Sequence, residues 1–288
     1  MSENTKGAAL MAMSMSAFTL NDACLKALSG DVPLFQTLFL RSIGTVVMLG
    51  VLCYAMGHFK KVGTKRDWRL IRWRMLGELG AAYCFVQALY NMPLGNVSAI
   101  LQSLPLTVSL AGAVFLGEAV GWRRLIAILV GFAGVMLIVR PGTDVFSPYS
   151  IYALGAVGFV TLRDIMARQL SRDIPSALIA FVTSIGVLAF AGLGTFTEDW
   201  AYVSPSSWWK LAGSATFIMG GYILSVAAMR HGEISFVAPF RYVSLLVALI
   251  LGFIFFREVP DTLMLLGAGI VVATGLFTLY REHRPKGR

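Results

Sequence analysis

The sequence predicts an all-α membrane protein with ten transmembrane helices, arranged as two inverted repeats of five helices. Composition gives the first support: 57% of the 288 residues are hydrophobic and 14% are charged, with a mean hydropathy of +0.74. A soluble domain carries about 25% charged residues, so a chain this apolar must expose much of its surface to lipid. The net charge of +9 lies in short clusters between apolar runs, which is typical of membrane proteins and not of a nucleic-acid-binding face.

Ten apolar stretches are long enough to cross a bilayer, for which a helix needs roughly 20 mostly apolar residues. They cover residues 6–28, 33–56, 74–92, 97–116, 123–140, 149–168, 175–196, 208–229, 234–256 and 262–280. Turn-forming sequences separate several of them: SGDVP follows the first, NMPLGN the third, RPGTD the fifth and SRDIP the sixth. We therefore expect nearly the whole chain to lie within the membrane.

The distribution of Lys and Arg predicts that both ends of the chain are cytoplasmic. With Met1 inside, the basic segment 57–74 faces the cytoplasm, where multi-pass proteins concentrate positive charge. Only Arg140, Lys210 and Arg257 then remain on the outer side. We expect a multi-pass protein of the bacterial inner membrane.

An internal repeat relates the two halves of the chain. TLNDACLKALSGDVP at residues 19–33 recurs as TLRDIMARQLSRDIP at 161–175, with seven identities in fifteen positions and Lys26 aligned with Arg168. Two later stretches also recur: GNVSAIL as GEISFVA, and FLGEAV as FFREVP. Two five-helix units in series must have opposite orientations in the membrane, which is the basis of alternating access in secondary transporters. We expect repeats over 1–145 and 146–288 that together form one transmembrane domain.

Three features resemble the drug/metabolite transporter superfamily, and within it the EamA-type exporters. They are the five-plus-five helices, the acids that close the fourth and ninth spans (Glu118, Glu258) and the glycine-rich fifth span GFAGVMLIVRPG. The tenth span, LLGAGIVVATG, matches the fifth only loosely. The resemblance covers essentially the whole chain, and it implies a secondary transporter that exports amino acids with broad or aromatic-tolerant specificity.

The sequence can also be examined for functions other than amino-acid export. Uptake of a vitamin such as riboflavin, or transport of another organic anion, remains open, as do proton coupling and facilitated diffusion. A membrane-embedded enzyme is disfavoured because the sequence has no HExxH or GxSxG motif, and no P-loop indicates ATP-driven pumping. We expect no cofactor, no metal and no nucleic-acid partner. The expected partners are a small-molecule substrate and the lipid bilayer, and the expected state is a monomer or weak dimer.

Charged residues inside the spans are the first candidates for functional roles. Asp22 and Lys26 have the i, i+4 spacing of a pair on one helix face, and Asp164 and Arg168 repeat it in the sixth span. Pairing lowers the cost of placing charges in hydrocarbon. Each pair is therefore either a structural pair at a helix end or a gate, one at each membrane face.

Two arginines lie deeper in the spans, at positions 41 and 241. An ionised Arg at mid-membrane costs at least about 2.5 kcal/mol, so neither is expected to face lipid. For Arg41 we favour a structural acid partner such as Glu78 or Asp22. For Arg241, binding of a substrate carboxylate stands beside a structural role.

Polar aromatic and amide side chains form the remaining candidates. Tyr83, Gln87 and Tyr90 share one face of the third span through their i, i+4, i+7 spacing. The predicted substrate-binding set is completed by four residues of other spans: Gln102, Tyr222, Arg241 and Tyr242. Such a set suits a zwitterionic metabolite with an apolar part. Hydrogen bonding of the same side chains to one another between helices is the alternative.

Overall fold

The computed structural model describes residues 3–60, 63–118, 121–143, 146–171, 173–230 and 234–282. All regular secondary structure in these ranges is helical. The longer helices are α1 (Glu3–Lys26), α2 (Leu34–Ala55), α3 (Lys65–Asn91), α4 (Leu94–Leu101), α5 (Leu104–Leu116), α6 (Trp122–Val139), α7 (Ser150–Arg168), α8 (Ser176–Gly194), α9 (Pro205–Arg230), α11 (Val243–Phe256) and α12 (Thr262–Glu282). Four short helices complete the description: η1 (His58–Lys60), η2 (Thr195–Thr197), α10 (Ile234–Val237) and η3 (Ala238–Tyr242).

Some features of the sequence analysis lie outside the described residues. They are the chain ends Met1 and Arg288, the basic residues Lys61 and Arg172, Ala119 and Val120 of the FLGEAV stretch, Asp144 of RPGTD, and Gly232 and Glu233 of the GEISFVA stretch. Within the described part, 8 helical stretches are long and apolar enough to cross a membrane. Two further long helices, α3 and α9, run beside them, so every predicted span overlaps a helix or a pair of helices.

The sequence predicts that the fourth and ninth spans are continuous helices. In the structure each of them is broken. Gln102 and Ser103 separate α4 from α5, and Pro105 lies in the first turn of α5. In the ninth span, Pro239 lies in η3 between α10 and α11. Proline has no N–H and clashes with the preceding turn of a helix, which explains why each break is next to one. The two breaks lie at corresponding places in the two halves.

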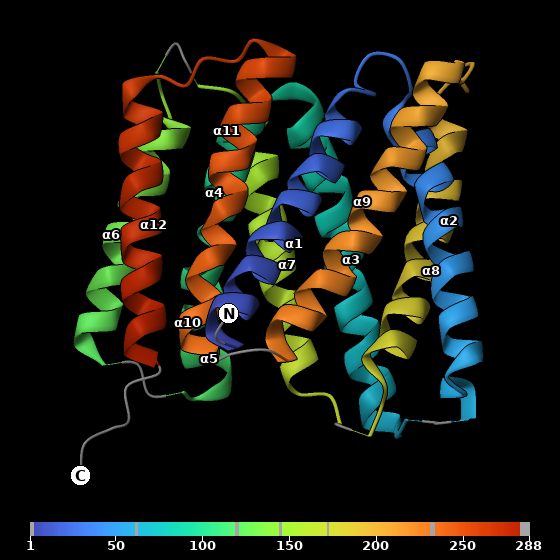
Figure 1. Ribbon diagram of the computed structural model, residues 1–288, viewed down its shortest axis with the longest axis horizontal. Helices are drawn as coiled ribbons and strands as arrows, with labels where there is room; N and C mark the ends of the chain where they lie inside the picture. The colour runs from blue at the N-terminus through green and yellow to red at the C-terminus, as the bar shows by residue number, and fades with distance from the viewer. Residues whose placement is uncertain are drawn as a thin grey trace.

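The helices pair across the two halves of the chain, as Figure 1 shows. The most extensive contacts join α1 to α9, α3 to α7, α2 to α8 and α6 to α12. The first helix of each half thus packs along the third of the other, while the second and the fifth pack against their own counterparts. Two halves that are related by a two-fold rotation exchange partners in this way.

The ends of α5 and α11 have the same geometry. Gly117 and Arg257 adopt left-handed conformations, with φ of 68° and 55°. The following N–H groups, of Glu118 and Glu258, donate to carbonyl oxygens six residues earlier, at 3.2 and 3.0 Å. Such a cap satisfies carbonyls that a helix end leaves unpaired. It also folds each glutamate back along its own helix.

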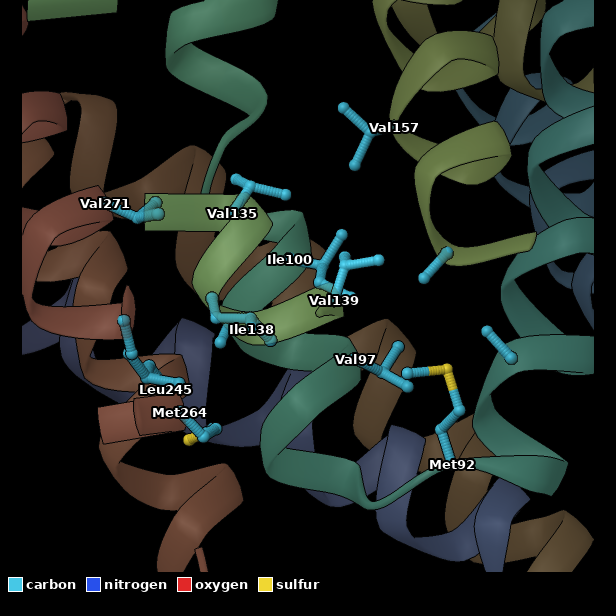
Figure 2. Close-up of a cluster of buried hydrophobic side chains, with 14 residues drawn as sticks. Met92, Val97, Ile100, Val135, Ile138, Val139, Val157, Leu245, Met264 and Val271 are labelled. Carbon is cyan, nitrogen blue, oxygen red and sulfur yellow. The ribbon is translucent and has the colours of Figure 1, made fainter. Parts of the chain in front are cut away.

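A buried apolar cluster connects the two halves (Figure 2). Met92 at the end of α3 and Val97 and Ile100 of α4 pack with side chains of α6, α7, α11 and α12. Val97, Ile100 and Met264 are at most 1% exposed. This cluster fixes the broken helix α4–α5 against the second half, which positions the cavity described next.

Candidate functional site

The helix bundle has two ends, which carry different charged residues. The Lys26 end carries the last turn of α1 and the connection between α11 and α12, and it lies at the top of Figure 1. The Arg168 end carries the last turns of α7 and α12, at the bottom of the same view.

A cavity of about 770 Å³ lies between the two halves. At the Arg168 end its lining includes Arg168 itself, Arg124 of α6 and Thr278 of α12. It extends along α1 as far as Asp22, and Arg41 of α2 lies in the same lining. The cavity is large enough for a metabolite of ordinary size, since ligand pockets occupy roughly 300–1,000 Å³.

Arginines outnumber carboxylates in the lining. The acids are Asp22, Glu78 and Asp164, and the arginines are Arg41, Arg124, Arg163, Arg168 and Arg241. Glu78 is 3.5 Å from Arg163 and 3.7 Å from Arg74, and the Nε of Arg163 donates to Asp164 at 2.9 Å. The excess of positive charge favours a solute that carries a carboxylate or another anionic group.

The charge pairs proposed from the i, i+4 spacing are not the ion pairs that the structure contains. Lys26 binds Glu258 at 3.0 Å instead of Asp22, and Arg168 binds Glu118 at 3.3 Å instead of Asp164. Both changes have one cause: the cap at the end of α5 or α11 brings a glutamate to the last turn of the neighbouring α7 or α1. Helix spacing alone does not reveal a competitor from another helix.

The Lys26 end is closed by apolar and polar contacts together. Leu25 of α1 and Leu28 of the turn that follows it are fully buried with Leu89 and Leu94. Lys26 also donates to the carbonyls of Leu89 and Met92, and the N–H of Leu94 donates to Glu258 at 2.7 Å. Side-chain exposure is 11% for Lys26 and 19% for Glu258, against 43% for Arg168 and 40% for Glu118. The two ends are thus built from corresponding residues, but the ion pair is nearly buried at the Lys26 end and half-exposed at the Arg168 end.

Four of the predicted substrate-binding residues line the cavity: Gln102, Tyr222, Arg241 and Tyr242. The Nε2 of Gln102 donates to the hydroxyl of Ser244 at 2.6 Å, which connects the two broken helices. Arg241 is exposed to the cavity, and among the described residues it forms no ion pair. The Tyr242 hydroxyl is directed at the backbone of Gly275 in α12, and its ring is 7% exposed.

The other three predicted residues, Tyr83, Gln87 and Tyr90, are not in the lining of this cavity. The ring of Tyr83 stacks on Phe35 of α2, with centroids 5.6 Å apart, and meets Phe190 of α8 edge-on. Tyr90 donates to Thr37 at 2.8 Å, and Gln87 donates to Tyr83 at 3.4 Å. The periodicity placed the three on one face, but helix packing directs that face toward α2 and α8.

Asn21 and Arg163 are site residues that the sequence analysis did not single out. They occupy the same position in the two copies of the repeat, immediately before Asp22 and Asp164. Asn21 donates to Asp22 at 2.8 Å, and Ser214 of α9 donates to Asn21 at 2.7 Å. The signal was present in the aligned repeat as the one difference between TLND and TLRD.

Comparison with known proteins gives one family and several relatives. A model of the EamA-like transporter family matches residues 5–140 and again 147–280. A pseudopaline exporter of Pseudomonas aeruginosa is 29% identical, over 96% of this chain and 97% of its own. An S-adenosylmethionine uptake transporter of Rickettsia conorii is 27% identical (96% and 93%), and a riboflavin transporter of Vibrio cholerae is 29% identical (86% and 83%). A solved crystal structure has the same fold, with a TM-score of 0.61 and 17% identity over 96% of this chain and 99% of that one.

Proposed function

Because the chain belongs to the EamA-like transporter family, we propose that it is a secondary transporter that moves an amino-acid-like metabolite across the bacterial inner membrane. The observation that carries the proposal is the cavity between the two family repeats, with an arginine, Arg241, that keeps no ion pair among the described residues. The solute crosses by alternating access, without a cofactor.

The two repeats are inverted with respect to each other in the membrane. The exchange of partners between α1–α9 and α3–α7, the equivalent breaks in the two spans and the matching caps at Glu118 and Glu258 support this relation. Inversion gives a transporter two conformations of similar energy, one open to each side.

The two corresponding ion pairs serve as gates. We name Lys26 and Glu258 the Lys26 latch, and Arg168 and Glu118 the Arg168 latch. The Lys26 latch is nearly buried, while the Arg168 latch is half-exposed beside the cavity lining. Each latch becomes buried when its end of the bundle closes, and becomes exposed to solvent, where the pair is weak, when that end opens.

The cavity faces the cytoplasm in this conformation. The basic first turns of α3, with Lys65, Arg66 and Arg69, lie at the Arg168 end, and positive charge is concentrated on the cytoplasmic side of multi-pass proteins. An inward-facing cavity is the state in which an exporter takes up its solute.

The solute is an amino acid with an apolar or aromatic part, and Arg241 binds its carboxylate. A charge-assisted bond in a partly desolvated cavity is stronger than a neutral one, and the rings of Phe18 and Tyr222, 5.3 Å apart, supply an aromatic wall. Uptake of a vitamin such as riboflavin is the second candidate function, supported by the riboflavin transporter among the relatives.

Transport into proteoliposomes tests the proposal. Purified protein is reconstituted, and efflux and counterflow of labelled amino acids, riboflavin and dicarboxylates are compared with protein-free vesicles. We expect saturable movement of amino acids with a free carboxylate. Movement of riboflavin alone supports the second candidate, and no movement of any solute contradicts both.

A further inference from the structure

Among the described residues, Asp22 differs from Glu78 and Asp164 in having no basic side chain within ion-pair distance, although the charge of Arg41 acts on it from further away. Glu78 pairs with Arg74 and Arg163, and Asp164 pairs with Arg163. Among the described residues, the hydrogen bond that Asp22 accepts comes from the neutral amide of Asn21, at 2.8 Å. A carboxylate that lines a cavity within the membrane is costly without a cation or a strong donor.

The repeat shows that this difference is built into the chain. Asp22 and Asp164 are equivalent, but the residue before the aspartate is Asn21 in the first half and Arg163 in the second. Arg163 neutralises Asp164 within its own helix. Asn21 instead fixes one oxygen of Asp22 and is itself held by Ser214, with Asn21 3% exposed and Ser214 fully buried.

The neighbouring cation on α1 is engaged elsewhere. Lys26 directs its ammonium group to Glu258 and to the carbonyls of Leu89 and Met92. An ammonium group has three donors, so these three acceptors use all of them. The other ionisable or phenolic groups around it in the cavity lining lie on four other elements: Arg41, Glu78, Tyr222, Arg241 and Tyr242.

We propose that Asp22 binds the ammonium group, or an equivalent cationic group, of the transported solute, while Arg241 binds its carboxylate. Asn21 acts as a positioning residue that orients the carboxylate of Asp22 toward the cavity. The inference rests on the proposed transport function and specifies its substrate class as a zwitterion.

Asp22 and Arg241 lie on either side of a contact between α1 and α11. The hydroxyl of Thr19 donates to the carbonyl of Ser244 at 3.3 Å, and the hydroxyl of Ser244 donates to the carbonyl of Arg241 at 2.9 Å. Asp22 lies three residues beyond Thr19, about 4.5 Å along the helix. Both charged side chains line the same cavity, as do Phe18 and Tyr222 of the aromatic wall.

Three probes that share one phenyl group test the proposal. L-phenylalanine carries both charges, 3-phenylpropionate lacks the ammonium group and 2-phenylethylamine lacks the carboxylate. Calorimetry at constant pH and ionic strength gives the affinity of each for the wild-type protein and for Asp22→Asn. The matched control is Asp164→Asn, the same change at the equivalent position of the other repeat.

The wild-type protein should bind phenylalanine about 10- to 150-fold more tightly than 3-phenylpropionate, as expected for a charge-assisted hydrogen bond. Asp22→Asn should remove this preference, and Asp164→Asn should retain it. A wild-type protein without the preference overturns the proposal before any variant is made. The proposal is also overturned if the preference persists in Asp22→Asn or disappears equally in Asp164→Asn.

Two further outcomes separate this inference from its premises. The same titrations are repeated at several pH values: if Asp22 only carries a proton, Asp22→Asn will change the pH dependence for all three probes and leave the preference intact, which overturns the ammonium role. If none of the probes binds while the proteoliposomes transport another solute, the zwitterion class is wrong and the transporter function stands.

Discussion

The ammonium nitrogen of Lys26 lies 3.0 Å from Glu258, and the equivalent Arg168 lies 3.3 Å from Glu118 at the opposite end of the bundle. Each basic residue ends the first helix of its repeat, and each glutamate follows the broken helix of the other repeat. The first pair is nearly buried and the second is half-exposed, so under the proposed gating role closing one end is offset by opening the other.

Removing one latch should favour the conformation in which the corresponding end of the bundle is open. Breaking a buried ion pair costs about 3–5 kcal/mol, whereas an exposed pair is worth about 0–1 kcal/mol. We expect Glu258→Gln to open the Lys26 end and Glu118→Gln to leave this conformation nearly unchanged. Spin labels at Asp31 and Val259, after replacement of the three native cysteines, should move apart in Glu258→Gln. Equal distance distributions in both variants would show that the latches are not gates.

Close packing of α6 and α12 should make Gly134 intolerant of a side chain. A Cβ at Gly134 would lie 2.9 Å from the backbone oxygen of Gly267, and backbone cannot move aside as a flexible side chain can. Overpacking of this kind costs about 1–3 kcal/mol. We expect Gly134→Ala to lower the thermal unfolding temperature of the purified protein.

The control for this substitution is Gly269 of α12, where a Cβ meets no atom within 4 Å. Gly269→Ala should be neutral or stabilising, because alanine favours helix by roughly 0.5–1 kcal/mol over glycine. A lower unfolding temperature in both variants would indicate a general effect of alanine on the helix and not a close contact.

Arg241 should control affinity for solutes with a carboxylate. Loss of a charge-assisted hydrogen bond worth about 1.5–3 kcal/mol weakens binding by roughly 10- to 150-fold. We expect Arg241→Ala to have this effect and Arg241→Lys to recover only part of it, because an ammonium group lacks the planar two-donor fork. Binding is measured on monodisperse protein. Unchanged affinity in well-folded Arg241→Ala would contradict the substrate role.

Acid should weaken one contact in the connection between α1 and α2. Lys210 of α9 donates to Asp31 at 2.7 Å, and this hydrogen bond lowers the pKa of Asp31 from its ordinary value of 3.8. A group with a depressed folded-state pKa contributes stability above its unfolded pKa and loses it as pH falls through the folded value. We expect the unfolding temperature to fall below about pH 4, and Asp31→Asn to reduce that dependence. An identical acid response in wild type and Asp31→Asn would exclude the contribution.

The sequence by itself determined the class of the protein and its internal symmetry. An apolar composition can be satisfied only by lipid contact, and the family model matches each half of the chain separately. The repeat also identified the corresponding charged residues, because aligned positions carry the same type of group in both halves. The helix-breaking effect of Pro105 and Pro239 was visible in the sequence, but the apolar runs masked it.

Partners between helices were decided only by the tertiary structure. Lys26 and Asp22 have the spacing of a pair, yet Glu258 is brought to Lys26 by a helix cap more than two hundred residues away in the chain. The face that carries Tyr83 and Tyr90 was correctly grouped, but its direction toward α2 and α8 depends on how α3 packs. Periodicity specifies which side chains share a face of one helix, and the rotation of that helix within the bundle is set by all its neighbours at once.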